Sequence, residues 1–233
     1  MAYLLGNGPS LSEFDLTTLA DETVYGCNII YKTYKPDYLI SLWQWQIWDL
    51  LKHEVPKTIP CRFSQRHFFS FIKQKGEDPN KYHRRYSHDF DIIEMNPHEK
   101  DNADKFFVVS THHEDHKRVK IWEMYKTYVF YLPDSYQISK LRPCPTIDDR
   151  YEPPVGAYAM NEALEDGHER LDIVGFDSVH GVVGTASGQM YFGDEGALMT
   201  RDTRNKPLWL KTYDKIESKF NDREIVWHTA KAS

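Results

Sequence analysis

Short apolar runs alternate with longer stretches of mixed polarity along the whole of the 233-residue chain. A short apolar run bounded by turn residues is typical of a buried strand, and apolar positions three or four apart are typical of a helix. The strands that this pattern predicts cover residues 2–6, 23–27, 38–42, 59–63, 106–110, 171–175 and 224–227. The helices that it predicts cover residues 11–20, 43–53, 112–125, 156–166 and 204–220.

This alternation of strands and helices predicts the fold class. Strands joined through helices make right-handed crossovers and a mostly parallel sheet. We therefore expect an α/β, Rossmann-like fold with helices on both faces of the sheet, formed by residues 1–233 as a single domain. Residues 75–105 are polar and lack periodic apolar positions, which predicts a loop-rich or lid-like insertion. Residues 178–204 form a second candidate lid segment.

Composition narrows the class of protein. The formal net charge of −6 disfavours a nucleic-acid-binding surface, which is ordinarily basic. The apolar runs are too short to span a membrane, and the first residues lack the basic and apolar regions of a secretory signal. Cys27, Cys61 and Cys144 are few and widely spaced, which suits a reducing compartment. We expect a cytoplasmic protein without a transmembrane segment and without a nucleic-acid partner.

A glycine-rich loop directly follows the first predicted strand. This loop reads Gly6-Asn7-Gly8-Pro9-Ser10. Glycines at the carboxyl end of a strand allow a tight turn and the close approach of a ligand, and amides at the start of a helix favour a phosphate. The alternative interpretation is a simple strand-to-helix turn in which Ser10 caps the helix. We favour a nucleotide site here because the loop opens the first strand–helix unit of the chain.

The loop does not match the fingerprint of a dinucleotide site. That fingerprint has a third glycine where this chain has Leu11, and an acidic residue after the second strand where this chain has Asn28. The amide of Asn28 can both donate and accept, which suits a base edge or a ribose. NAD is therefore disfavoured, and the Gly-Lys-Ser/Thr ending of a P-loop is also missing.

Two separated stretches form a second pattern: GNGPSLSEFDL followed by VYGCNIIY near the start of the chain, and GAYAMNEALEDGHERLDIVGFDSVHG in its last third. These stretches resemble the bacterial lipooligosaccharide sialyltransferases. The family begins with the same strand, loop and second strand, and carries a similar helix, turn and strand in the same order. The resemblance covers about a quarter of the chain, and the opening motif is shared by a wider group of Rossmann-like proteins.

The resemblance implies a metal-independent transferase that uses a cytidine monophosphate (CMP) sugar under a lid. By motif, Asn7, Gly8 and Ser10 would contact the phosphate or ribose, within a loop completed by Gly6 and Pro9. Asn28 would contact the nucleotide. Gly156 would begin a helix whose N-terminus faces the nucleotide, and Asp177 would lie beside the donor.

The chain departs from the family pattern at three places. Pro153-Pro154-Val155 replaces the hydroxyl residues that precede the helix glycine in the family, and Ser178-Val179 stands where the family has a tyrosine for the leaving phosphate. The segment before the late helix lacks the general-base histidine of the family. Tyr191 could replace a second family tyrosine, although its spacing differs.

Glycosyl transfer needs a base for the acceptor hydroxyl and stabilisation of the departing phosphate. His180 lies three residues beyond Asp177, at a predicted strand end, so either His180 or Asp177 can be the base. Tyr191 is the candidate for the leaving phosphate. Weaker candidates for the same two roles are Asp194, Glu195, Arg201 and Arg204. His112 and His116 share a helical spacing, but with no third ligand in view we expect no metal site.

The sequence thus favours a sialyltransferase-like glycosyltransferase with a CMP-linked sugar donor, a glycan or other small acceptor, and no cofactor. One alternative is a nucleotide-binding Rossmann-like protein that has lost transferase activity. A phosphotransfer enzyme on a similar scaffold is a further alternative. A homo-oligomer is compatible with the sequence.

Overall fold

The structure, a computed structural model, describes most of the chain. The described residues are 1–42, 44–64, 72–73, 92–112, 125–147, 152–177 and 206–229. The chain forms two compact units, the first made of Met1–Ile40 with Leu141–Ser233 and the second of Ser41–Lys140. The single domain over residues 1–233 stays a prediction.

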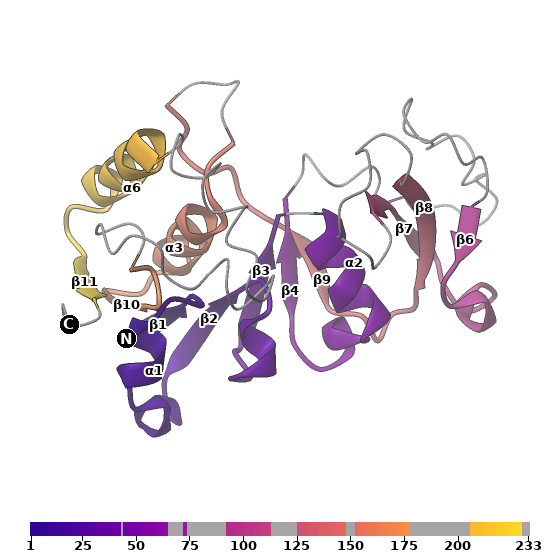
Figure 1. Cartoon of the computed structure of the whole chain (residues 1–233), viewed down its shortest axis with the longest axis horizontal. Helices are drawn as coiled ribbons and strands as arrows, with labels where there is room; N and C mark the ends of the chain where they lie inside the picture. Colours follow the sequence, from indigo (N-terminus) through magenta and orange to yellow (C-terminus); the bar gives the residue numbers. More distant parts are fainter. Residues whose placement is uncertain are drawn as a thin grey trace. The chain divides into compact units, whose positions relative to one another are not determined.

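A seven-stranded parallel sheet confirms the predicted α/β class (Figure 1). Its strand order is β11-β10-β1-β2-β3-β4-β9. The strands are β1 (Ala2–Leu5), β2 (Thr23–Cys27), β3 (Tyr38–Ser41), β4 (Cys61–Phe63), β9 (Ile138–Lys140), β10 (Arg170–Val174) and β11 (Glu224–His228). All but β9 were predicted from the apolar pattern. Since β1 is the first strand and lies between β2 and β10, the carboxyl ends of strands distant in sequence meet around it.

Burial explains why these runs are strands. Leu4 and Leu5 of β1 and Ile173 of β10 are fully buried, as expected for parallel strands covered on both faces. The register pairs Leu4 with Ile173 and Leu5 with Val174, so the two strands end together. This common end fixes the position of the loop that follows β1.

Helices cover the strands of the first unit. The predicted helix over 11–20 is divided into α1 (Ser10–Glu13) and a 3₁₀ turn at Leu16–Leu19. The predicted helices over 156–166 and 204–220 are confirmed as α3 (Val155–Glu165) and α6 (Lys206–Lys219), which pack on each other (Figure 1). Helix α3 also packs on β1, β2 and β10.

The second unit contains a four-stranded sheet with the order β5-β7-β8-β6. These strands are β5 (Ile72–Lys73), β6 (Ile92–Glu94), β7 (Lys105–His112) and β8 (Tyr125–Leu132). Strands β7 and β8 pair antiparallel over all their residues, and α2 (Gln44–Lys52), which confirms the predicted helix over 43–53, packs on β7. This sheet was not predicted, apart from the strand at 106–110.

Two predictions in the second unit need correction. The predicted helix over 112–125 is wrong at both ends, because His112 ends β7 and Tyr125 begins β8. Residues 113–124 lie outside the described residues. The predicted loop-rich insertion over 75–105 contains β6 and a 3₁₀ turn at Pro97–Glu99, since Ile92 and Ile93 pair with β8. Its residues 75–91 lie outside the described part, as do residues 178–204.

The helices in the part of the chain that the structure describes are short or polar. None of them is both long enough and apolar enough to span a bilayer.

Candidate functional site

The loop after β1 is closed against the turn after β10. Gly6 N–H donates to Val174 O at 2.8 Å and Gly8 N–H donates to Gly175 O at 2.7 Å. A Cβ on Gly8 would lie 2.7 Å from Gly175 O, closer than real atoms pack. Gly175 has a φ of +80°, which favours glycine, and a Cβ there would lie 2.6 Å from Gly6 O. These glycines therefore allow two strand ends to touch, a role that the sequence analysis did not include.

Ser10 and Asp177 form the polar centre of this junction. The backbone N–H and the hydroxyl of Ser10 both donate to Asp177 Oδ2, each at 3.0 Å. The Ser10 hydroxyl also accepts from Gly175 N–H at 2.9 Å. Ser10 is 4% exposed and Asp177 is 1% exposed. An internal carboxylate thus occupies the position at the start of α1 where the sequence suggested a phosphate.

Pro9 completes the junction by fixing the start of α1. It is the N-cap residue, with a φ of −57° and a ψ of −37°, and its carbonyl accepts from both the backbone N–H and the hydroxyl of Ser12. The pyrrolidine ring already holds φ near this value, so the helix starts with little further loss of backbone freedom. The predicted capping role of Ser10 is replaced by its contact with Asp177.

Asn7 and Asn28 lie together at the ends of β1 and β2. The side chain of Asn7 donates to Cys27 O at 3.4 Å, and Asn28 N–H donates to Ile40 O at 2.9 Å. Asn28 has a left-handed backbone with a φ of 58°, which asparagine tolerates better than most residues. Its Oδ1 atom is buried and has no hydrogen-bond partner among the described residues. An unmatched buried acceptor marks a place where a ligand donor would fit.

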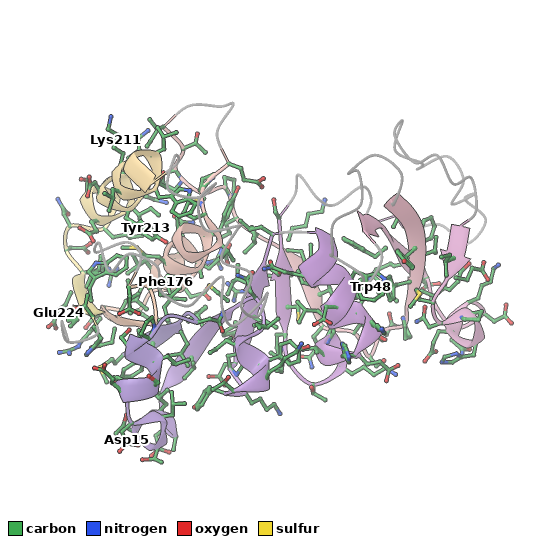
Figure 2. All side chains as sticks on the ribbon, in the orientation of Figure 1. Asp15, Trp48, Phe176, Lys211, Tyr213 and Glu224 are labelled. Carbon is green, nitrogen blue, oxygen red and sulfur yellow. The ribbon has the colours of Figure 1, made fainter. Side chains whose placement is uncertain are left out.

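Gly156 reaches the same junction from α3. A Cβ at this position would overlap the ring of Phe176 and the hydroxyl of Tyr213, and both side chains lie beside α3 (Figure 2). Phe176 also lies 2.8 Å from the place of a Cβ on Gly6. The structure therefore joins Gly6 and Gly156 through Phe176, although they are far apart in sequence. Nothing in the sequence pattern singled out Phe176 or Tyr213.

The remaining predicted residues lie outside the described part of the chain. His180 and Tyr191 belong to residues 178–205, as do the weaker candidates Asp194, Glu195, Arg201 and Arg204. His116 is likewise outside it. Among the residues that the structure describes, no three side chains of the metal-binding kinds gather in one place.

A second polar cluster, which the sequence analysis missed, lies on β10 and β11. Asp172 is 2% exposed; Arg170 Nε donates to its Oδ2 at 2.7 Å, and His228 Nε2 lies 2.7 Å from its Oδ1. Burial alone would raise the pKa of Asp172, but hydrogen bonds from Arg170 and His228 outweigh it and lower the pKa. The sequence could have placed Arg170 and Asp172 on one face of β10, because side chains alternate along a strand. It could not have added His228, which is 56 residues from Asp172.

Comparison with protein-family models, curated proteins and solved structures found no match. The site therefore rests on its own geometry, in which the ends of β1, β2 and β10 bring together Gly6, Asn7, Gly8, Pro9, Ser10, Asn28, Gly156 and Asp177.

Proposed function

We propose that the chain is a sialyltransferase-like glycosyltransferase that binds a CMP-linked sugar at the carboxyl ends of β1, β2 and β10, without a metal. Open parallel sheets bind ligands beyond these ends of their strands. The proposal is supported by the order of the loops around that edge, which agrees with the resemblance of the two sequence stretches.

The single observation that carries the proposal is the buried acceptor of Asn28. Its Oδ1 lacks a donor among the described residues, while its backbone N–H is held by Ile40 O. Leaving a buried polar atom unmatched is unfavourable by about 1–3 kcal/mol. A cytosine amino group or a ribose hydroxyl supplies the missing donor. Asn7, which bonds to Cys27 O next to Asn28, provides a second amide for the same ligand.

Asp177 has a positioning role in this proposal. Its Oδ2 accepts two hydrogen bonds from Ser10, so it holds the β1 loop against β10. His180, three residues later, is then the better choice for the base that takes the acceptor proton. Because Asp177 already accepts both donors of Ser10 at the start of α1, the donor phosphate needs its partners elsewhere, and we assign Tyr191 to it.

A second candidate function is nucleotide binding without transfer. The departures from the family pattern favour it, because the general-base histidine is missing and Pro153-Pro154 stands before the helix glycine. Release of CMP from CMP–sialic acid by the purified protein separates the two, because only the transferase or its hydrolytic side reaction produces it.

Calorimetric titration with CMP, UMP, GMP, AMP and NAD, with and without magnesium, tests the site. We expect metal-independent binding that is selective for CMP. Asn28→Gly keeps the left-handed backbone and removes the acceptor, so it should weaken CMP binding about tenfold, the effect of one lost hydrogen bond.

Glu54→Gly is the matched control for this variant. Glu54 is the other described non-glycine residue with a positive φ, 53°, and it lies in the second unit. The Glu54→Gly variant should leave CMP binding unchanged. The proposed nucleotide site is wrong if no nucleotide binds, or if the Asn28→Gly variant binds CMP as tightly as the unmodified protein does.

A further inference from the structure

Strand β11 is an edge strand of the seven-stranded sheet and pairs with β10 on its inner side. All five of its residues are in continuous register with β10, from Glu224 opposite Arg170 to His228 opposite Val174. On its outer side, the backbone of β11 has no strand partner among the described residues. A regular edge of this kind is a template for another strand.

The two edge strands of the sheet, β9 and β11, differ in how well they are protected from pairing with a strand of another chain. Strand β9 has three residues, carries Lys140, and is mostly exposed. Short edge strands that carry lysine resist pairing with other chains. Strand β11 reads Glu-Ile-Val-Trp-His, with neither lysine nor proline. Its three central residues are only half-buried, so apolar area remains exposed along this edge.

Helix α6 extends this apolar area. Trp227 of β11 packs edge-on against Tyr213 of α6, with 5.2 Å between ring centroids, and its indole N–H donates to Glu217 at 3.0 Å. Leu210 lies two helical turns before Glu217, on the same side of α6, and is 36% exposed. The exposed leucine therefore lies on the same side of α6 as Glu217, which contacts Trp227 of β11.

The sequence of β11 is complementary to itself. When a second β11 is placed antiparallel, with the two-fold axis at Val226, Glu224 faces His228 of the second copy and Ile225 faces Trp227 of the second copy. The Glu224 side chain is 59% exposed and that of His228 is 36% exposed, so both can be reached. Within each copy, Arg170 donates to Glu224, and His228 Nε2 lies 2.7 Å from Asp172 Oδ1, so the facing Glu224 and His228 form a polar pair across the junction.

We infer that the chain forms a two-fold symmetric dimer in which the β11 strands of two copies pair antiparallel, flanked by the Leu210 side of both α6 helices. Closed two-fold pairing is the commonest symmetric association of identical chains. Five ladder residues alone bury less than the roughly 1,200 Å² of a stable interface, so the α6 contact is a necessary part of it. This inference is independent of the proposed function.

Size-exclusion chromatography with light scattering, at protein concentrations between about 1 and 100 µM, measures the mass of the protein in solution. Because a dimer forms by mass action, this mass should rise with concentration. We expect twice the chain mass at the upper concentrations. Leu210→Glu, an exposed change, and Val226→Lys, which places two charges at the axis, should each give the monomer. Ser139→Lys on β9 is the matched edge control and should leave the dimer intact.

Cysteine crosslinking tests the register and keeps the inference testable if Val226→Lys fails to fold. Val226→Cys should form a disulfide between copies under mild oxidation, because only residue 226 faces itself across the axis. Glu224→Cys alone should not. The native cysteines Cys27, Cys61 and Cys144 are buried and should not interfere. A monomer at every concentration, a dimer that survives both charged variants, or equal crosslinking by the two cysteine variants would overturn the inference.

Discussion

At the scale of single residues, the site depends on a few polar atoms whose partners come from distant parts of the chain. Ser10 and Asp177 are 167 residues apart and yet share two hydrogen bonds. The sequence identified both residues, Ser10 as a ligand contact or helix cap and Asp177 as a neighbour of the donor or a base, because a motif shows which groups are available and not which groups satisfy one another. Asn28 was also identified, and its unmatched Oδ1 is a fact that only the structure provides.

The hydrogen bonds of Ser10 predict that its substitution by alanine lowers the stability of the protein more than the same substitution at Ser12. Ser10→Ala removes the hydroxyl that donates to Asp177 and accepts from Gly175 N–H, and it leaves both buried groups short of a partner. We expect the free energy of unfolding, measured with urea, to fall by about 2–3 kcal/mol. Ser12→Ala removes an exposed hydroxyl and should change it by less than about 0.5 kcal/mol. Equal effects of the two variants would contradict this assignment.

At the scale of elements, the pattern of apolar residues predicted the strands that are buried on both faces, but in the four-stranded sheet it predicted only part of β7. The parallel strands β1, β2 and β10 are short apolar runs that a sheet must cover on both sides. Strand β8 contains three tyrosines together with a threonine, a valine and a phenylalanine, which signals a strand, but the polar stretch before it suggested a helix that continued to Tyr125. Pairing with β7 decides its structure.

Gly175, in the turn after β10, and Gly167 both have a positive φ, but we expect substitution by alanine to lower the free energy of unfolding more at Gly175. Gly175→Ala places a Cβ against Gly6 O and forces a left-handed alanine, so we expect a loss of about 2–5 kcal/mol in unfolding free energy. Gly167 has a φ of +93° with nothing within 4 Å of a Cβ. Gly167→Ala should therefore show only the conformational part, about 1–2 kcal/mol. Thermal or urea unfolding of both variants checks this; a larger loss for Gly167→Ala would contradict it.

At the scale of the whole molecule, the α/β class followed from the sequence, whereas the division into two compact units did not. The first unit joins residues from both ends of the chain, and the intervening residues 41–140 form the second. The one stretch of distinct composition, residues 75–105, lies inside the second unit and marks neither of its boundaries. The described residues of the predicted site lie in the first unit, because β1 and β10 are neighbours in the sheet although most of the chain lies between Leu5 and Arg170.

Hydrogen–deuterium exchange with and without saturating CMP tests the central claim, that the nucleotide site lies at the carboxyl ends of β1, β2 and β10. The account predicts slower exchange in peptides that cover residues 6–10 and 27–28. Exchange at residues 54–57 and 224–228 should stay unchanged. Unchanged exchange at residues 6–10 and 27–28, whether or not CMP slows exchange elsewhere, would contradict the account.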